Sequence, residues 1–323
     1  MAGNSSHRGW NQDLVQMSFT LGLEKLPPLS KHSETRPVFI AIAQRGCLVH
    51  MAKKAAGECI QLGREYTFPG ISSPVLLRID DLTTHVLIFG GTPQKRTALT
   101  QKIVEEALRL KRKVLVISTN RSWSEVLGRR KNVMVFDGPM QNFTLRRVMG
   151  VGRTSCAVFQ LEGHQPQAVD SFLAEVLADI FRGLERETNK LELLLVLDEV
   201  YDKVAGLSFL GPFEEIPLEH GLFRSQGVLW LERGVRELRK FGRGIVITSA
   251  RMGSINEETL SNVWTLIHLG SKDSSEVEAA RMFFENSEKI MELGEDTGLM
   301  VSPNCNYGQP LLVKFDLIAK EKG

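Results

Sequence analysis

The 323-residue sequence predicts an α/β protein whose mostly parallel, twisted sheet carries helices on both faces. Short apolar runs alternate with amphipathic segments from Leu76 onward, which is typical of such a sheet. Two of the runs end in glycine or acidic residues, after Phe89 and after Leu197, where open α/β sheets bind their ligands. No window approaches the ~18 uninterrupted apolar residues that a membrane span requires, so no membrane partner is expected.

The spacing of apolar residues predicts strands and helices in order along the chain. The expected strands are Val86 to Phe89, Val114 to Ser118, Val133 to Phe136, Ala157 to Leu161, Leu193 to Leu197, Ile245 to Ser249 and Leu266 to Leu269. The expected helices are Thr97 to Leu110, Gln167 to Arg186, Gly227 to Phe241 and Ser274 to Leu293. Two late runs, Gly298 to Val301 and Leu311 to Phe315, are expected to form a C-terminal hairpin or edge strands.

The chain divides into three expected parts. Residues 1 to 36 are polar and are interpreted as an N-terminal extension. Residues 37 to 73 are expected to form a small subdomain, with a strand within 37 to 50 and a short helix from Met51 to Leu62. Residues 74 to 323 are expected to form the main α/β domain, which includes the C-terminal hairpin and helix.

The composition is typical of a soluble globular protein. A hydrophobic content of 42% and a charged content of 24% are ordinary for a soluble globular protein. The N-terminus has no basic stretch leading into an apolar core, so a cytoplasmic location is expected. The four cysteines lack Cys-x-x-Cys spacing, which favours buried reduced thiols over a metal or redox site. Because the net charge is only +2, any DNA-binding surface must be local.

The stretch Val86 to Thr97 reads Val-Leu-Ile-Phe-Gly-Gly-Thr-Pro-Gln-Lys-Arg-Thr, an apolar run followed by an altered phosphate-binding loop. The intact loop has a glycine, four residues, then glycine, lysine and serine or threonine, and its backbone N–H groups surround a phosphate. Gly90 and Thr97 have the correct spacing. Lys95 stands in place of the second glycine and Arg96 in place of the lysine. An ordinary strand-to-helix turn is the alternative interpretation.

The apolar run from Leu193 to Leu197 ends in Asp198 and Glu199. In P-loop ATPases an aspartate at such a strand end holds magnesium, and an adjacent glutamate can polarise the attacking water. Helix capping or a solvated acid pair is the alternative. Because the pair follows the loop by about 100 residues, the chemical interpretation is favoured.

These two elements, with four further stretches in the same order, resemble the HerA/FtsK branch of P-loop ATPases, which are ring-forming motors that pump double-stranded DNA. Ser72 to His85 resembles the short strand and histidine that precede the family's phosphate loop, and Ala157 to Gly163 with the helix after it resembles an extra strand and helix. Gly234 to Gly244 resembles the family's Arg-Lys-aromatic-Gly segment, and Ile245 to Asn262 resembles its sensor strand and the segment after it. The resemblance covers about residues 74 to 285.

The resemblance implies a RecA-like fold, with ATP and Mg²⁺ as cofactors. It assigns magnesium to Thr97 and Asp198, the positioning of water to Glu199, and a role across a subunit boundary to Arg239. It also implies double-stranded DNA as a partner, in a homo-oligomeric ring or a hetero-oligomer with an active paralogue, and a nuclease as a further candidate partner. ATP would be contacted by Gly90, Gly91, Thr92, Lys95, Arg96 and Thr97.

Several positions depart from the family pattern. Arg96 keeps the positive charge, but its planar group is bulkier than a lysine ammonium. Pro93 removes one backbone N–H, and Lys95 has a β-carbon where glycine is preferred. Ala250 stands in the sensor strand where the family carries glutamine. Three explanations stay open: a turn that never meets phosphate, weak ATP binding without turnover, or an ATPase in which Lys95 replaces Arg96.

Two classes of function therefore compete. The first is a HerA/FtsK-like ATPase of weak or altered activity, which translocates along or unwinds double-stranded DNA as a ring; the retained Asp198 and Glu199 favour it. The second is an inactive pseudo-ATPase that serves as a structural or regulatory subunit of a DNA-processing complex. The changed loop and Ala250 favour this second class. A nucleotide-gated switch that binds ATP but hardly hydrolyses it lies between them.

Overall fold

The computed structural model describes residues 58–66, 73–150, 154–205, 225–281, 283–284, 287–294, 296–303 and 309–317. The extension predicted for residues 1 to 36 and the strand predicted within 37 to 50 lie outside these residues.

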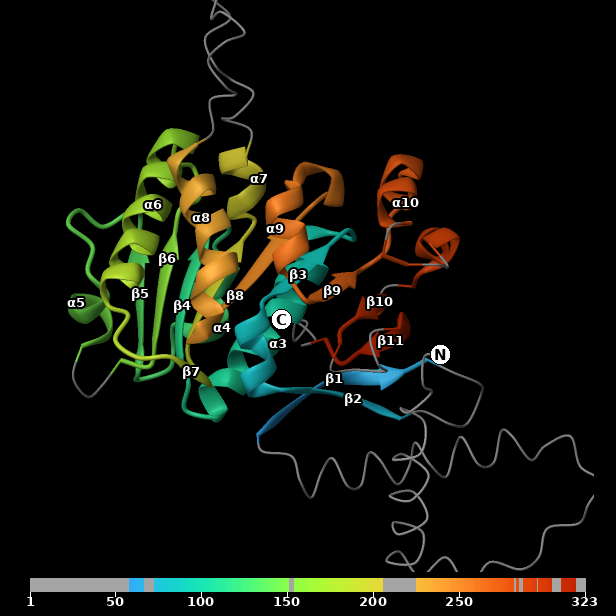
Figure 1. Cartoon of the computed structure of the whole chain (residues 1–323), viewed down its shortest axis with the longest axis horizontal. Coiled ribbons are helices and arrows are strands. Elements are labelled where there is room, and N and C mark those ends of the chain that lie inside the picture. The colour runs from blue at the N-terminus through green and yellow to red at the C-terminus, as the bar shows by residue number, and fades with distance from the viewer. Residues whose placement is uncertain are drawn as a thin grey trace, which may run out of the picture. The chain divides into compact units, whose positions relative to one another are not determined.

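One eleven-stranded sheet organises the described residues (Figure 1), in the order β2-β1-β11-β10-β9-β3-β8-β7-β4-β6-β5. From β9 to β5 all neighbouring strands are parallel, whereas β10, β11, β1 and β2 extend the sheet in antiparallel fashion. The strands are β1 (Cys59–Glu65), β2 (Pro74–Arg78), β3 (Val86–Phe89), β4 (Lys113–Ser118), β5 (Val133–Asp137), β6 (Cys156–Gln160), β7 (Thr188–Asp198), β8 (Phe241–Ser249), β9 (Thr265–His268), β10 (Thr297–Val301) and β11 (Leu311–Phe315).

Helices cover both faces of the parallel part. One face packs against α3 (Pro93–Arg109) and α4 (Ser122–Leu127). The other face packs against the remaining helices, which are α5 (Leu145–Met149), α6 (Pro166–Arg182), α7 (Val200–Ala205), α8 (Gln226–Glu237), α9 (Glu257–Asn262) and α10 (Ser274–Ala280). Four 3₁₀ turns complete the described elements: η2 (Ile79–Thr84), η4 (Leu238–Lys240), η5 (Met252–Ser254) and η6 (Ser287–Glu292).

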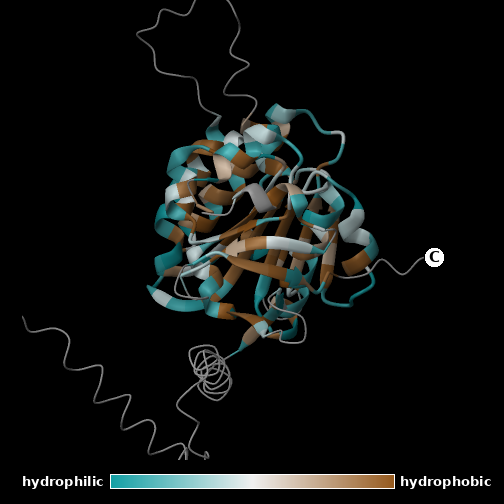
Figure 2. Cartoon of the chain, turned by 90° about the vertical axis from the view of Figure 1, so that its right-hand side faces the viewer, coloured by the Kyte–Doolittle hydropathy of each residue, from teal (hydrophilic) through white to brown (hydrophobic). Residues whose placement is uncertain are grey.

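Side-chain alternation along the strands explains why the sheet has two cores. In β3, Leu87 and Phe89 belong to the core under α6 and α8, while Val86 and Ile88 belong to the core under α3. All four residues are buried, as expected for a parallel strand covered on both sides. In Figure 2 the strands are largely brown, and teal dominates the outer helical surfaces and loops. None of the helices in the described ranges combines the length and apolar character that crossing a membrane requires.

The predicted fold class is confirmed, and all seven predicted parallel strands form. β3 has the predicted limits, whereas β7 and β8 begin earlier, at Thr188 and Phe241. The predicted C-terminal hairpin is also confirmed, because β10 and β11 pair in antiparallel fashion. The boundary expected between residues 73 and 74 falls between β1 and β2, which pair with each other.

Two predicted helices are wrong in part. Cys59 to Leu62, the described end of the helix expected from Met51, lies in β1, whose alternating burial is typical of a strand. The helix expected from Ser274 to Leu293 ends at Ala280, and the separate turn η6 begins at Ser287. Phe284, which lies between them in sequence, is fully buried near the rings of Phe89 and His268.

Two further helix limits differ in ways that affect the site. α3 begins at Pro93, one turn before the predicted Thr97, because Thr92 accepts the capping hydrogen bond and proline suits the first helical position. α8 ends at Glu237 rather than Phe241, and η4 then leads directly into β8.

Candidate functional site

The candidate site lies where the parallel strands β3, β8, β7 and β4 end side by side. β8 separates β3 from β7, so the glycine-rich loop and the acid pair face each other across the end of one strand. The registers place Phe89 opposite Ser249, and Ser118 opposite Asp198. This is the sheet edge at which open α/β proteins bind ligands, as the sequence predicted.

Only three residues, Gly90, Gly91 and Thr92, connect β3 to α3. Both glycines have positive φ, 71° and 63°, which favours glycine. At Gly90 a β-carbon would lie 2.7 Å from the carbonyl oxygen of Gly270, so a larger residue does not fit. The Gly91 N–H donates to that same carbonyl, 2.5 Å away. The loop is therefore short and is bound to the segment that follows β9.

Two backbone N–H groups in the first turn of α3 form hydrogen bonds within the chain. The Lys95 N–H donates to the side-chain oxygen of Thr92 at 3.4 Å, and the Arg96 N–H donates to the carbonyl of Thr92 at 3.2 Å. Pro93 has no N–H to donate. These contacts leave the start of α3 with few of the backbone donors that surround a phosphate in an intact loop.

Arg96 is the most altered residue of the loop, and its side chain is only 2% exposed. Its Nε and Nη2 atoms donate to the two carboxylate oxygens of Glu199, at 2.7 and 2.9 Å. Its Nη1 atom donates to the carbonyl oxygens of Gly90 and Gly91, at 2.9 and 3.0 Å. Arg96 thus bridges the loop and the acid pair with four hydrogen bonds, and two of them form a bidentate ion pair.

Glu199 is held in an uncommon backbone conformation, with a φ of 60°. Its N–H donates to the hydroxyl of Thr248 in β8, at 2.8 Å. This contact and the bidentate pair with Arg96 stabilise the conformation and direct the carboxylate toward the loop.

These contacts do not match what a bound phosphate needs. Phosphate is held by N–H donors and a cation, whereas the loop carbonyls of Gly90 and Gly91 point at the Arg96 guanidinium. The guanidinium charge is already paired with Glu199, the residue that would position water. In this arrangement the groups expected to bind and cleave ATP are bonded to one another.

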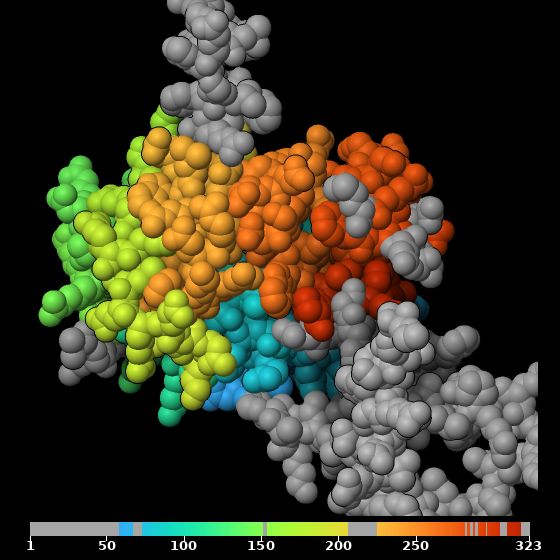
Figure 3. All heavy atoms as spheres, viewed as in Figure 1, coloured from blue at the N-terminus to red at the C-terminus, as the bar shows by residue number. Residues whose placement is uncertain are grey.

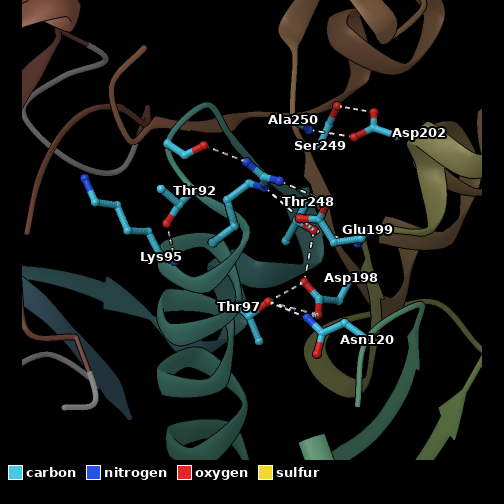
Figure 4. Close-up of polar contacts among 12 residues, drawn as sticks. Thr92, Lys95, Thr97, Asn120, Asp198, Glu199, Asp202, Thr248, Ser249 and Ala250 are labelled. Atoms are coloured by element: carbon cyan, nitrogen blue, oxygen red, sulfur yellow. Dashed lines mark hydrogen bonds and ion pairs between the residues drawn. The ribbon is translucent and has the colours of Figure 1, made fainter. Parts of the chain in front are cut away.

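Lys95 does not take over the place of the lysine. Its side chain extends away from the acid pair (Figure 4), and its Nζ donates to the carbonyl of Gly294 at 3.2 Å. The arrangement therefore lends no support to an ATPase in which Lys95 replaces Arg96.

The other half of the site is a hydrogen-bonded cluster around Asp198, which is fully buried at the end of β7. Five side chains donate to its carboxylate, from α3, β4, the loop after β4, α4 and β8. They are Thr97 at 3.2 Å, Ser118 at 3.0 Å, Asn120 at 3.3 Å, Trp123 at 2.8 Å and Thr248 at 3.1 Å. The pairing of Thr97 with Asp198 brings together the two residues to which magnesium was assigned (Figure 4).

The electrostatics of Asp198 reflect burial first and hydrogen bonding second. Burial raises the pKa of Asp198, and the donated hydrogen bonds from Trp123, Ser118 and Thr248 act in the opposite direction. Because five protein donors use the carboxylate lone pairs, the cluster satisfies this acid without a metal ion. Whether it also binds magnesium stays a prediction.

A second acid, Asp202, binds the residues at the end of β8. Ala250, which stands in place of the family's glutamine, donates its N–H to Asp202 of α7 at 2.6 Å. The hydroxyls of Ser249 and Ser254 donate to the other oxygen of Asp202, at 2.5 and 2.9 Å. The end of β8 is therefore fixed by an acid one turn after Glu199.

Arg239 lies at the opposite ends of the parallel strands, where β8 begins. It sits in η4, just before β8 begins, whereas the loop follows the end of the parallel strand β3. Its guanidinium lies over the ring of Trp264, 5.5 Å from the ring centre. Trp264 is 42% exposed, so both groups lie at the surface. Arg239 cannot reach the loop of its own chain and could act only on a neighbouring one.

Sequence reasoning missed five residues that hold the site together, which are Ser118, Asn120, Trp123, Asp202 and Thr248. Ser118 and Thr248 end or nearly end apolar strands, as Asp198 does. The rule that identified Asp198 would have identified them, because the carboxyl ends of parallel strands meet at one edge. Nothing in the sequence signals Trp123, whose indole N–H reaches a residue 75 positions away.

Comparisons with known proteins bear on the fold. No protein-family model and no curated protein matches the chain. VirB4 of Thermoanaerobacter pseudethanolicus is similar, with a TM-score of 0.56 at 11% identity over 81% of this chain and 97% of that one. The chain has a RecA-like fold. This is the fold that the HerA/FtsK-type resemblance implied.

Two further solved structures are more distant. The genome packaging NTPase B204 from Sulfolobus turreted icosahedral virus 2, in complex with ATP-gammaS, has a TM-score of 0.47 at 11% identity, over 73% of this chain and 99% of that one. The pCW3 conjugation coupling protein TcpA has a TM-score of 0.46 at 14% identity, over 80% of this chain and 65% of that one.

Proposed function

We propose that this RecA-like chain is a pseudo-ATPase, which serves as a structural or regulatory subunit of a DNA-processing complex and does not turn over ATP. The observation that carries the proposal is the position of Arg96, which bonds to Glu199 and to the carbonyls of Gly90 and Gly91. One side chain thereby engages the acid that would position water and the loop that would hold phosphate.

Breaking this arrangement to admit a phosphate is costly. A buried ion pair that loses one partner leaves an uncompensated charge, at a cost of about 3 to 5 kcal/mol. An incoming triphosphate would also have to turn the two loop carbonyls away from its own negative charge. These costs oppose nucleotide binding and support a structural or regulatory role, for which the fold is needed but ATP is not.

The position of Arg239 supports a role in an assembly. It lies on the sheet edge opposite its own loop, at the surface beside Trp264. In the resembled family a basic residue of this segment serves the neighbouring subunit's nucleotide site. Arg239 is therefore suited to serve the nucleotide site of an active paralogue in a mixed ring. Double-stranded DNA enters the proposal through the same resemblance.

A second candidate function is a weak ATPase that translocates or unwinds double-stranded DNA as a ring. The hydrogen bond between Thr97 and Asp198 favours it, because these are the two residues expected to hold magnesium. In this alternative the phosphate of ATP would compete with Glu199 for the guanidinium of Arg96.

Calorimetry and thermal unfolding of the full chain with millimolar Mg-ATP test the proposal. We expect neither binding heat nor a change in melting temperature, while the chain remains folded throughout. Binding that weakens in the Asp198→Ala variant would replace the pseudo-ATPase with a nucleotide-gated switch. Steady ATP turnover that is abolished in Glu199→Gln, purified in parallel to exclude a contaminating ATPase, would instead establish the motor.

A further inference from the structure

The strand β5 forms one edge of the sheet and leaves two large apolar side chains exposed. In the described residues it pairs with β6 alone. Met134 is 42% exposed and Val135 is 37% exposed. Edge strands are usually protected by an internal charge, a proline, a bulge or a covering element. The interior of β5, Val-Met-Val-Phe, contains neither a charge nor a proline.

Hydrogen bonds to β6 show which backbone groups of β5 point outward. The Gly138 N–H donates to Gln160, and the Asn132 carbonyl accepts from Ser155 and Cys156, so even-numbered positions face β6. Because backbone groups alternate along a strand, the groups of Val133, Val135 and Asp137 face the open side. The Val133 N–H is used locally by the Arg130 carbonyl. The N–H groups of Val135 and Asp137 therefore point toward the open edge.

The nearby helix α5 is fixed on a face of the sheet, not along this edge. Two backbone N–H groups before and at its start, those of Phe143 and Leu145, donate to Glu175 and Asp179 of α6. Val148 and Met149 of α5 are buried in the core under α6. In Figures 1 and 3 the green segment around β5 and α5 lies at the left rim of the described part.

Charges of opposite sign stand at the two ends of β5. Lys131 precedes the strand, Asp137 ends it, and both are exposed. Neither has an ion pair within the described residues. A strand with a positive start, an apolar middle and a negative end is complementary to itself when a second copy runs in the opposite direction.

We propose that β5 pairs in antiparallel fashion with β5 of a second copy of this chain, across a two-fold axis at Met134. Lys131 then lies opposite Asp137 of the partner subunit, and Val133 opposite the partner's Val135. In this register the outward N–H groups of Val135 and Asp137 donate to the partner's Val133 and Lys131. The two sheets become one continuous sheet, and the exposed apolar pair is covered. This pairing does not depend on the nucleotide site.

Sedimentation of the full chain across the micromolar range tests the pairing. We expect a concentration-dependent dimer that Val135→Lys weakens by at least about tenfold, because pairing would bury the lysine charge against the partner's apolar Val133. Leu229→Lys is the matched control, since Leu229 is 40% exposed on α8 and should leave the dimer unchanged. Circular dichroism melting at low concentration verifies that both variants fold.

Charge reversal distinguishes this register from other dimers. Lys131→Asp or Asp137→Lys alone should weaken the dimer about three- to tenfold, because like charges then face each other twice. The combination Lys131→Asp with Asp137→Lys should restore it. Both outcomes follow only from the antiparallel register.

An engineered cysteine gives an independent readout. Met134 lies opposite itself in the non-hydrogen-bonded pair, where Cα atoms are about 4.5 Å apart and a disulfide can form. Met134→Cys should therefore oxidise to a covalent dimer, whereas the control Met291→Cys, at a position that is more exposed (50% against 42%), should not. A chain that stays monomeric at every concentration overturns the proposal. So does a dimer that is insensitive to Val135→Lys and fails to cross-link through position 134.

Discussion

The candidate site has two halves, the loop with Arg96 after β3 and the cluster around Asp198 at the end of β7. Both lie at the carboxyl ends of parallel strands, but their charged groups differ in what they contact. In the half where magnesium was expected, Thr97 hydrogen-bonds to Asp198. In the half where phosphate was expected, Arg96 bonds to Glu199 and to loop carbonyls. Asp198 is surrounded by neutral donors, whereas the charge of the Arg96 guanidinium is already paired with the Glu199 carboxylate.

The difference shows which parts of a ligand site also stabilise the fold. Asp198 connects the ends of β4, β7 and β8 to the first turn of α3 through Ser118, Thr248 and Thr97. Its removal disturbs the sheet edge with or without a ligand. Arg96 stabilises the fold in a different way, because its ion pair with Glu199 and its bonds to Gly90 and Gly91 join the loop to the end of β7.

The largest expected effect is that of Asp198→Ala. Up to five buried donors lose their acceptor, and we expect a loss of about 4 kcal/mol or more in the free energy of unfolding. The gain from no longer burying a carboxylate, whose pKa burial has raised, offsets part of this loss. Urea denaturation in metal-free buffer measures it.

Asp198→Asn is the matched control, since asparagine keeps the volume and one acceptor oxygen. It should cost less than Asp198→Ala. If Asp198→Ala changed the stability by less than about 0.5 kcal/mol without metal, Asp198 would be a ligand residue only, and the contrast between the two halves would disappear.

A smaller effect is expected from Arg96→Ala, about 3 kcal/mol, because it leaves the mostly buried Glu199 without its partner. The double variant Arg96→Met with Glu199→Leu should recover much of the loss, since apolar replacement of a buried pair is often neutral. A double-mutant cycle by denaturation gives the coupling energy. A coupling near zero would mean that the pair contributes nothing to the fold.

Most of the fold could be predicted from the sequence because parallel strands covered on both faces are continuous apolar runs. Val86 to Phe89 is such a run, and its limits were predicted correctly. The predictions were wrong where tertiary contacts determine the end of an element. The helix from Ser274 ends early because Phe284 packs near Phe89 and His268, contacts between residues far apart in the chain.

The candidate site was predictable in its position and residue types, but not in its bonding. Asp198 and Glu199 at a strand end, and Thr97 at the loop, are adjacent as expected. The pairing of Arg96 with Glu199 joins residues 103 positions apart and depends on where α3 begins. That start was readable in Thr92-Pro93, a capping residue followed by proline, although the spacing of apolar residues predicted a start at Thr97.

The smallest expected effect concerns two buried histidines at opposite ends of the central strands. Burial lowers the pKa of His85, before β3, to about 3 and that of His268, at the end of β9, to about 4. Each is neutral in the folded state and titrates near 6.5 when unfolded. The stability they contribute is complete above pH 6.5 and falls as the pH drops toward the folded pKa, by up to about 1.4 kcal/mol per pH unit for each histidine.

Single variants separate these histidines from the acid at the site. The raised pKa of Asp198 acts in the opposite sense, because protonation of this acid is easier in the folded state and adds stability at low pH. Unfolding free energies between pH 7 and 5 should therefore fall less steeply in His85→Gln and in His268→Gln than in the unchanged chain. His268 borders Gly90, whereas His85 lies at the other end of β3. Equal slopes of unfolding free energy against pH in the two variants would therefore show that low pH destabilises both ends of the sheet. A pH slope that persists unchanged in both variants would mean that neither buried ring remains neutral in the folded state.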